Sequence, residues 1–473
     1  MGRIKHIHFV GIGGVGMAGI AEVLLSQGYQ ISGSDLSDNV LTKKLREGGA
    51  TIYLGHAADH IAQADVVVRS SAVSLDNPEC VAAREAHIPI VPRAEMLGEL
   101  MRFRHGIAIA GTHGKTTTTS LVTAILAEAK VDPTFVIGGQ LNSAGSHAHL
   151  GAGHYLVAEA DESDASFLYL KPMISVVTNI DADHLATYHN NFSELRQTFI
   201  DFLRQLPFYG LAVLCVDDPV VREILPEVPR PHVNYGFTDD ADYRAHTIQQ
   251  HGFRTHFVAE RPHGYSSLAI NLNLPGRHNI LNALAAIAVA TELGMPDDAI
   301  QSALEKFGGI GRRFQIYGDF VSQKGSHITL LDDYGHHPRE IAATLEAARQ
   351  SWPDRRLVMV YQPHRYTRTR DLFEDFCDVL AKPDQVFLLD VYSAGEKIIE
   401  GADSASLVRR MNEKGVPAKH ISQHHAVAAE LQNILQEGDV LLMQGAGNIG
   451  SMAMHLAASH LRESVPVVAS EAS

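Results

Sequence analysis

Residues 107–119 read Ile107-Ala-Ile-Ala-Gly111-Thr-His-Gly114-Lys115-Thr116-Thr-Thr-Thr119. The apolar run from Ile107 predicts a buried strand, and the segment after Lys115 is compatible with a helix. Glycines between a strand and a helix let backbone N–H groups face an anion, and the helix N-terminus adds partial positive charge. Lys115 and the Thr116 hydroxyl are then suited to phosphate and Mg²⁺. We therefore predict a nucleotide triphosphate site.

The spacing of this loop differs from that of the standard phosphate loop. The pattern G-x-x-x-x-G-K-[ST] has a longer gap between its glycines, whereas Gly111 lies three residues before Gly114. The motif alone also allows a threonine-rich capped helix that follows a buried strand. The residues expected at the phosphates are Gly111, Thr112, His113, Gly114, Lys115, Thr116 and Thr117.

The composition is that of a globular protein with more than one domain. The 473 residues exceed what one hydrophobic core usually organises, and 45% apolar with 20% charged residues is ordinary. With 54 acidic and 39 basic residues, the formal net charge is −15. This charge opposes non-specific nucleic-acid binding, so we expect no nucleic-acid partner and locally positive pockets for anionic substrates.

Cysteine content and hydropathy bear on the compartment. The three cysteines, Cys80, Cys215 and Cys377, are scattered and odd in number, which predicts neither a disulfide framework nor a cysteine-based zinc site. No apolar run approaches the roughly 20 residues that span a bilayer. The apolar patch after Lys5 is interrupted by glycines, which argues against a signal peptide. We expect a cytoplasmic protein with no membrane partner.

Residues 1–104 predict a Rossmann-like unit. A short strand precedes the turn Gly11-Ile-Gly13-Gly14-Val-Gly16, and a second strand ends at Asp35, 19 residues after the last glycine. This pattern is typical of dinucleotide sites. Because such glycines recognise a pyrophosphate, the alternatives are NAD or FAD, another nucleotide diphosphate, or a purely structural turn.

Three further polar residues of this unit follow predicted strands. Ser70 and Ser71 lie just past one strand end, and His56 lies past another. Ligands of open α/β sheets bind at the carboxyl ends of the strands, so these residues are candidates for the same ligand. A lone histidine such as His56 can equally be a bystander.

Residues 105–311 form the second predicted unit. Glu159 ends a strand and begins an acidic cluster, and a carboxylate there can hold Mg²⁺ opposite a phosphate loop. Asp183 and His184 follow the next strand and could supply a metal ligand or a proton-transfer group. The alternatives are a solvated acidic loop and a helix cap by Asp183.

Two asparagines begin a later alanine-rich helix of this unit. Asn279 and Asn282 are three residues apart and point from one helix face. Their amide groups offer both donor and acceptor and could recognise an adenine edge. Capping would explain Asn279 alone.

Residues 312–473 form the third predicted unit, which begins with Arg312-Arg313 after a glycine-rich hinge. One strand ends in Asp332-Asp333-Tyr334-Gly335-His336-His337-Pro338, and the next in Gln362-Pro-His364-Arg365-Tyr366-Thr-Arg368. Arginine offers a bidentate fork to carboxylates, so these ends predict an anion or carboxylate site. A solvated basic loop is the alternative.

Eight motifs in one order across the chain resemble the Mur ligases, the amide-bond-forming enzymes of bacterial cell-wall synthesis. They are Gly11-Ile-Gly-Gly-Val-Gly-Met17, Gly111-Thr-His-Gly-Lys-Thr-Thr117, Glu159-Ala-Asp-Glu-Ser-Asp164, Asp183-His184, Pro275-Gly-Arg-His-Asn279, Arg312-Arg-Phe314, Asp332-Asp-Tyr-Gly-His-His-Pro338 and Gln362-Pro-His-Arg-Tyr366. Each motif alone is weak, but their combination is specific.

The resemblance implies an α/β protein of three domains. A Rossmann-like N-terminal domain (1–104) would hold a UDP-sugar, a central P-loop-type ATPase domain (105–311) would hold ATP, and a Rossmann-like C-terminal domain (312–473) would bind the amino acid. The implied substrates are UDP-N-acetylmuramate, L-alanine and ATP, with Mg²⁺, two ions being expected in the reacting complex. A monomer or a homodimer is expected.

The resemblance also implies roles by position. Gly11, Gly13, Gly14, Gly16, Asp35, His56, Ser70 and Ser71 would bind the UDP-sugar; Lys115 would contact the ATP phosphates; Thr116, Glu159 and His184 would hold metal; His278, Asn279, Asn282 and Arg313 would contact ATP; and Tyr334, His336, Arg365 and Arg368 would face the amino acid. Lys115, His184, His336, Arg365 and Arg368 form the expected catalytic set. No lysine lies between Lys171 and Lys306, so the carbamylated lysine of later family members is not expected.

The implied reaction is phosphorylation of the sugar carboxylate by ATP, followed by attack of the alanine amine on the acyl phosphate. One alternative is a recycling Mur ligase that adds a preformed peptide to the same sugar nucleotide. An NAD-dependent oxidoreductase would explain the first glycine turn but not Lys115. A non-catalytic nucleotide-binding module would explain both loops.

Overall fold

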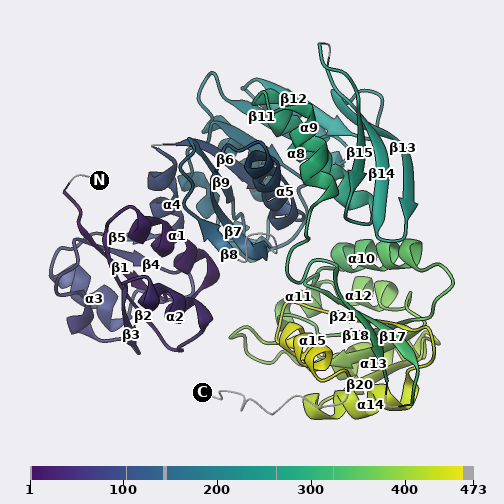
Figure 1. The fold of residues 1–473 in the computed structure, drawn as a ribbon. Helices are drawn as coiled ribbons and strands as arrows, with labels where there is room; N and C mark the ends of the chain where they lie inside the picture. Colours follow the sequence, from purple (N-terminus) through teal and green to yellow (C-terminus); the bar gives the residue numbers. More distant parts are fainter. Residues whose placement is uncertain (1–2, 103, 142–145, 263, 323, 462–473) are drawn as a thin grey trace. The chain divides into compact units, whose positions relative to one another are not determined.

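The computed structural model describes residues 3–102, 104–141, 146–262, 264–322 and 324–461. It contains three mainly parallel β-sheets with helices, as the α/β prediction requires (Figure 1). Two compact units are present: the first spans 1–249, 256–273 and 279–308, and the second spans 250–255, 274–278 and 309–473. No helix among the described residues combines the length and apolarity that crossing a membrane requires.

The first unit begins with a five-stranded parallel sheet in the order β3-β2-β1-β4-β5. Its strands are β1 (His6–Val10), β2 (Gln30–Asp35), β3 (Thr51–Leu54), β4 (Val66–Arg69) and β5 (Ile90–Pro92). Its helices are α1 (Val15–Ser26), α2 (Val40–Glu47), η1 (Ala58–Ile61), α3 (Pro78–Glu85) and α4 (Arg93–Met101). The glycine turn thus joins the central strand β1 to α1, as predicted from the sequence.

Helix α1 is apolar over most of its surface and packs on both the first and the second sheet. Met17, Ile20 and Leu24 are buried in a core that also includes Val136 and Ala148 of the second sheet. A Cβ atom on Gly19 would lie 3.0 Å from the Ala148 side chain, so the glycine allows the close approach. This shared core explains why the first two sheets form one compact unit.

The second sheet has ten strands in the order β15-β14-β13-β12-β11-β10-β6-β9-β7-β8. They are β6 (His105–Ala110), β7 (Thr134–Leu141), β8 (Ser146–His149), β9 (Tyr155–Glu159), β10 (Ile174–Val177), β11 (Leu211–Cys215), β12 (His232–Gly236), β13 (Tyr243–His251), β14 (Arg254–Glu260) and β15 (Leu268–Leu272). The helices are α5 (Lys115–Glu128), η2 (Ser166–Tyr169), η3 (Leu185–Tyr188), α6 (Phe192–Arg204), α7 (Pro219–Ile224), η4 (Leu225–Glu227), α8 (Arg277–Glu292) and α9 (Asp297–Glu305). Strand β6 lies between the parallel strands β9 and β10, so the loop that follows β6 has a neighbouring strand on each side.

The second unit contains a six-stranded sheet in the order β16-β17-β21-β18-β19-β20, parallel except for the β16–β17 pair. Its strands are β16 (Gln315–Val321), β17 (His327–Asp333), β18 (Leu357–Tyr361), β19 (Gln385–Leu389), β20 (Ala418–Ile421) and β21 (Val440–Gln444). Its helices are α10 (Pro338–Ser351), α11 (Tyr366–Asp371), α12 (Phe373–Val379), α13 (Ser404–Glu413), η5 (His424–Ala426), α14 (Val427–Ile434) and α15 (Ile449–Ala458).

Helices cover both faces of this third sheet (Figure 1). Side chains of a strand alternate between faces, and β18 follows this rule. Met359 and Tyr361 pack with α10, α12 and α13, whereas Val358 and Val360 pack with α14 and α15. Burial on both faces explains why β18 is a continuous apolar run in the sequence.

Helix α3, one of the helices of the first sheet, carries a buried carboxylate. The Glu79 side chain is 0% exposed. Ser34 Oγ donates a hydrogen bond of 2.6 Å to it, and the Nδ1 atoms of His60 and His56 lie 2.7 and 3.2 Å away. Burial raises the pKa of Glu79, but the nearby His8 and the hydrogen bonds with Ser34 and His60 outweigh this effect and lower the pKa to about 2. The folded state therefore favours the charged carboxylate.

We predict that Glu79→Gln destabilises the protein by about 1–3 kcal/mol at pH 7, because buried donors lose a charged acceptor. Since the pKa is lower in the folded state, this stabilisation is fully present above the ordinary value of 4.5 and is lost as pH falls towards about 2. Calorimetric unfolding at pH 7 and pH 3 measures the difference. Glu22→Gln, which breaks a partly exposed pair with Lys44, is the control and is expected to change little. An equal loss at both pH values would contradict the assignment.

Candidate active site

The turn after β6 requires glycine at two positions. Gly111 and Gly114 have φ angles of 126° and 84°, which side chains rarely adopt. A Cβ atom on Gly111 would lie 2.1 Å from Thr178 Oγ1, and one on Gly114 would lie 2.5 Å from Asn282 Oδ1. The neighbouring strand and helix therefore pack directly on the glycine backbone.

The loop that follows β10 braces this turn. The Thr112 N–H donates to the Asn179 carbonyl (3.1 Å), and the His113 N–H donates to Asn179 Oδ1 (2.8 Å). Asn179 Nδ2 in turn donates to the His113 carbonyl (3.0 Å). A role for Asn179 was not predicted; its position just after β10, the strand next to β6, is the signal that could have identified it.

Lys115 begins α5 and folds back over its own turn. Its Nζ donates to the carbonyls of Gly111 (2.6 Å) and Thr112 (3.1 Å) and forms an ion pair with Glu162, at 2.7 Å from Oε2. Lys115 thus lies at the predicted turn, and its phosphate role stays a prediction. Glu162, a member of the acidic cluster that begins at Glu159, is the ion-pair partner of Lys115 and is 2% exposed.

Burial and neighbouring charges act in opposite directions on this pair. Burial lowers the pKa of Lys115, but the charges of Glu162 and Asp161 outweigh it and raise the pKa above its ordinary value. Burial raises the pKa of Glu162 to about 7, although Lys115 pulls it down. Arg93 adds positive charge through an ion pair of 3.3 Å with Asp161. Lys115 therefore stays charged at neutral pH, and an anion that draws it away would leave Glu162 inclined to accept a proton.

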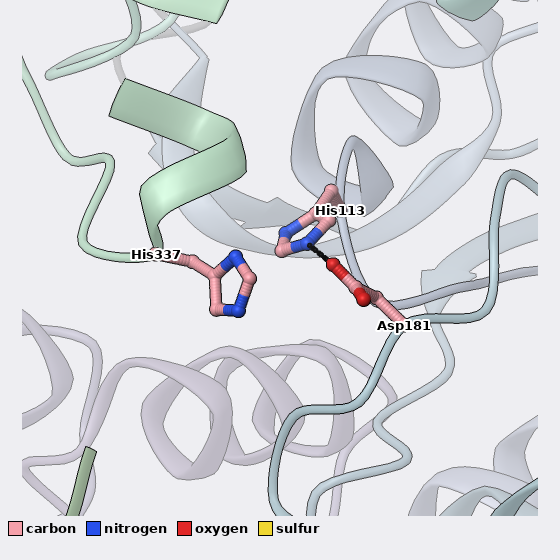
Figure 2. Close-up of side chains that lie close together, drawn as sticks. All are labelled: His113, Asp181 and His337. Carbon is pink, nitrogen blue, oxygen red and sulfur yellow. Dashed lines mark hydrogen bonds and ion pairs between the residues drawn. The ribbon is translucent and has the colours of Figure 1, made fainter. Parts of the chain in front are cut away.

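The loop histidine has an acidic partner. His113 Nε2 lies 3.1 Å from Asp181 Oδ2, and Figure 2 shows the two side chains pointing toward one another. His337, drawn in the same view, belongs to the second compact unit. Asp181 also accepts a hydrogen bond from the Ala182 N–H (2.8 Å). A role for Asp181 was not predicted.

The predicted metal residues Glu159 and His184 have separate partners. Glu159 lies at the end of β9, next to β6, and accepts a hydrogen bond of 2.8 Å from the Gly138 N–H. His184 Nε2 lies 3.5 Å from Asp183 Oδ2. The Tyr188 hydroxyl, in η3 after His184, donates to the Glu162 carbonyl and so ties this segment to the acidic loop. Thr116 is 7% exposed in the first turn of α5. Their metal role stays a prediction.

The predicted adenine residues lie at the start of α8. Thr118 Oγ1 donates to Asn282 Oδ1 (3.2 Å), and Asn282 Nδ2 donates to Asn279 Oδ1 (3.2 Å). Asn282 is thus beside Gly114 and α5, a contact that was not predicted, and its adenine role stays a prediction. Burial lowers the pKa of His278, against the charges of Asp333 and Glu346.

The first glycine turn lies against Asp35, as its pattern predicts. The Gly13 N–H donates to Asp35 Oδ2 (2.8 Å), and Asn39 Nδ2 donates to the Gly13 carbonyl (3.1 Å). A Cβ atom on Gly11 would meet the Ser70 side chain at 3.0 Å, and one on Gly16 would meet Arg93 Nη1 at 2.4 Å. Gly14 is the N-cap residue of α1. Arg93 is a basic residue at this turn that the sequence analysis did not identify.

The other two predicted UDP-sugar residues, His56 and Ser71, have different surroundings. His56 Nδ1 is 2.9 Å from Ser34 Oγ and takes part in the Glu79 network. Ser71 lines a cavity of about 610 Å³ together with Arg69 and Arg93. The arginines supply the locally positive surface that the acidic chain was expected to need for anions.

In the second unit, aromatic rings connect the two predicted strand ends. Tyr334 is edge-on to His336 at 5.6 Å between ring centroids, and His336 lies 5.5 Å from His364. His364 stacks on Tyr392 at 5.6 Å. The structure therefore brings Tyr334 and His336 together, and it adds Tyr392, which follows β19 and was not predicted.

The two predicted arginines lie at the start of α11. Arg365 has a φ angle of 71°, its N–H donates to the Tyr392 carbonyl (2.8 Å), and its buried Nε has no hydrogen-bond partner. Arg368 is 7% exposed, and its Nη1 lies 3.3 Å from His364 Nδ1. The guanidinium carbon of Arg313 is 5.0 Å from the Tyr334 ring centroid. Cationic groups thus surround the row of rings, which suits a carboxylate ligand.

The sequence matches the Mur ligase family along most of its length. Three segments match: "Mur ligase family, catalytic domain" at 6–105, "Mur ligase middle domain" at 109–290, and "Mur ligase, glutamate ligase domain" at 312–447. A crystal structure of a UDP-N-acetylmuramate-alanine ligase from Thermotoga maritima is 30% identical, with a TM-score of 0.81 over 97% of this chain and 99% of that one.

Two more distant structures share the fold. A murein peptide ligase from Psychrobacter arcticus is 23% identical, with a TM-score of 0.71 over 98% of this chain and all of that one. A MurF ligase from Thermotoga maritima, solved in complex with ADP, is 15% identical, with a TM-score of 0.60 over 91% of this chain and 95% of that one.

The three matched segments and the 30% identical structure define the class of protein, an ATP-dependent ligase. The chain belongs to the Mur ligase family, and its activity is of the peptidoglycan-precursor class. Mur ligases use ATP and Mg²⁺, and the three-domain α/β fold expected from the sequence is confirmed. The assignment of individual residues to ligands stays a prediction.

We predict that Lys115→Met lowers substrate-dependent phosphate release on the order of a hundredfold or more, because a preorganised charge at the transferred phosphate is lost. The substitution also leaves Glu162 buried without its cation, so stability should fall. The double variant Lys115→Met/Glu162→Gln should recover stability but not turnover. Lys130→Ala, at the other end of α5, is the control and should keep full activity. Recovery of turnover in the double variant would contradict the phosphate role.

Proposed function

We propose that this protein joins L-alanine to the lactyl carboxylate of UDP-N-acetylmuramic acid, with ATP converted to ADP and phosphate. The observation that carries the proposal is the 30% identity to an alanine ligase across 97% of the chain. The Lys115–Glu162 loop and the cationic ring cluster around Tyr334 support it, because they offer separate sites for a triphosphate and for an amino-acid carboxylate.

The first proposed step is phosphoryl transfer. A carboxylate oxygen of the sugar attacks the γ-phosphorus of ATP, the bond to the β-phosphate oxygen breaks, and ADP leaves. Negative charge accumulates at the turn between β6 and α5. Lys115 would stabilise this charge once a phosphate draws its Nζ from the Gly111 and Thr112 carbonyls and from Glu162, together with the positive N-terminal end of α5. The rigid bracing by Asn179 limits the reorganisation that the step requires.

The second proposed step is amide formation. The neutral alanine amine attacks the carbonyl carbon of the acyl phosphate, the carbon–oxygen bond to phosphate breaks, and the amine loses a proton. Arg365 and Arg368 would orient the alanine carboxylate, and Tyr334 and His336 would line the same site. A proton can pass to a nearby base or to the departing phosphate.

The residues proposed for Mg²⁺ suit a hard cation. Glu159 is a carboxylate at the end of a strand beside β6, Thr116 offers a hydroxyl, and His184 follows the neighbouring strand. The oxygen atoms of Glu159 and Thr116 are of the kind that Mg²⁺ prefers, whereas His184 would contribute an imidazole nitrogen. When bound, Mg²⁺ would neutralise phosphate charge and polarise the transferred group.

The recycling ligase that accepts a preformed peptide is the alternative. Its support is the fold shared with a murein peptide ligase at 23% identity. The Tyr334-Gly335 pair favours the single amino acid in our interpretation, and the Tyr334 ring lies edge-on to that of His336.

An acceptor panel tests the proposal. Phosphate release is measured with ATP, Mg²⁺ and UDP-N-acetylmuramate, adding in turn L-alanine, L-serine, glycine or the preformed peptide. We expect release that depends on all three substrates and is fastest with L-alanine. Faster turnover with the peptide would support the recycling activity, and no acceptor-dependent release would refute both.

A further inference from the structure

The third sheet has a glycine turn of its own, Gly445-Ala-Gly447-Asn-Ile-Gly450, between β21 and α15. A turn of this kind next to a helix N-terminus is a common site for phosphate groups. In the first two sheets such turns are the predicted nucleotide sites. The proposed reaction assigns no ligand to the third turn.

Side chains of the second unit fill this third turn. The Arg312 guanidinium donates to the carbonyls of Gly445 and Gly447, and a Cβ atom on Gly450 would lie 2.0 Å from Arg312 Nε. Gln362 Oε1 accepts a hydrogen bond from the Ile449 N–H (3.1 Å). A Cβ atom on Gly447 would lie 2.4 Å from Gln362 Oε1. The glycines therefore make room for an arginine and a glutamine of the protein itself.

Arg312 is held firmly at its backbone as well. Its φ angle is 60°, which is uncommon for a residue with a side chain. Its N–H donates to Gln315 Oε1 (2.8 Å), and its carbonyl accepts from the Tyr334 N–H (2.7 Å). Its Nε lies 3.5 Å from Asp332 Oδ2, and Asp332 is fully buried. Together these contacts hold the Arg312 side chain in one particular place, although its backbone conformation is uncommon.

That place is next to the Tyr334 ring. The guanidinium carbon of Arg312 lies 5.0 Å from the ring centroid, the same distance as that of Arg313. Tyr334 then contacts His336, whose ring is followed by those of His364 and Tyr392. The first ring thus contacts a guanidinium that the glycine turn holds.

We propose that Arg312 is a positioning residue for the amino-acid site, and that the third glycine turn is its socket rather than a nucleotide site. Arg312 acts through Tyr334, whose ring it holds by a cation–π contact while the turn carbonyls hold the guanidinium. This inference rests on the proposed function in so far as Tyr334 faces the amino acid.

The test compares four variants of the full-length chain in steady-state phosphate release. Arg312→Ala removes the guanidinium, Gly450→Ala displaces it, and Arg312→Lys keeps the charge but loses the fork. Arg355→Ala is the matched control at the other end of β21. Arg355 donates to the carbonyls of Gly438 and Asp439 and lies over the Trp352 ring at 6.0 Å.

We expect Arg312→Ala and Gly450→Ala to raise the KM for L-alanine about tenfold or more, from the loss of a cation–π contact and charge-assisted hydrogen bonds. The KM values for ATP and the sugar nucleotide should stay within about twofold. Arg312→Lys should fall in between, and Arg355→Ala should match the wild type. Equal losses for all three substrates, or the same effect in Arg355→Ala, would overturn the inference.

A second measurement separates this inference from the proposed function. Protein labelled with 3-fluorotyrosine gives a ¹⁹F resonance for Tyr334, assigned by its loss in Tyr334→Phe. This resonance should shift in Arg312→Ala and Gly450→Ala but not in Arg355→Ala. If the wild type does not use L-alanine, the proposed function fails while the shift still tests the positioning role. An unshifted resonance would refute the positioning role.

Discussion

The active site depends on the close packing of two strand ends and one helix against the backbone of Gly111 and Gly114. A side chain at either position would overlap Thr178 or Asn282. The turn combines a left-handed backbone at both glycines with a Lys115 side chain that folds back to the Gly111 carbonyl. Asn179 braces the same turn, and Glu162 pairs with the Lys115 that follows it. A preorganised turn of this kind suits a reaction whose steps concentrate negative charge.

Three glycine turns occur at strand ends, and their surroundings make them different. The first is bonded to Asp35 and approached by Arg93. The second is braced by Asn179 and covered by Lys115. The third is filled by Arg312 and Gln362. A glycine pattern indicates that another group packs closely against the backbone. It does not report whether that partner is a ligand or a side chain of the protein.

Much of the candidate site was predictable because parallel strands bring their carboxyl ends to one edge. Lys115, Asp35 and Asn282 were found because each follows a strand or begins a helix next to a glycine turn. Glu162, Asp181, Arg93 and Tyr392 were not assigned, because their partners are between 28 and 68 residues away in the chain and no local spacing identifies them. Which ligand each of these residues binds remains a prediction.

The sequence by itself determined the α/β class, the three glycine turns and the family, because strand periodicity, glycine spacing and motif order are local or linear properties. Only the tertiary structure decided which charges are paired in the interior. It set Glu162 against Lys115 and Arg312 against the third turn. The physical reason is that burial acts on whatever groups the fold brings together. Burial raises the pKa of Glu162 to about 7, and a neighbouring cation opposes that shift only when the fold places it there.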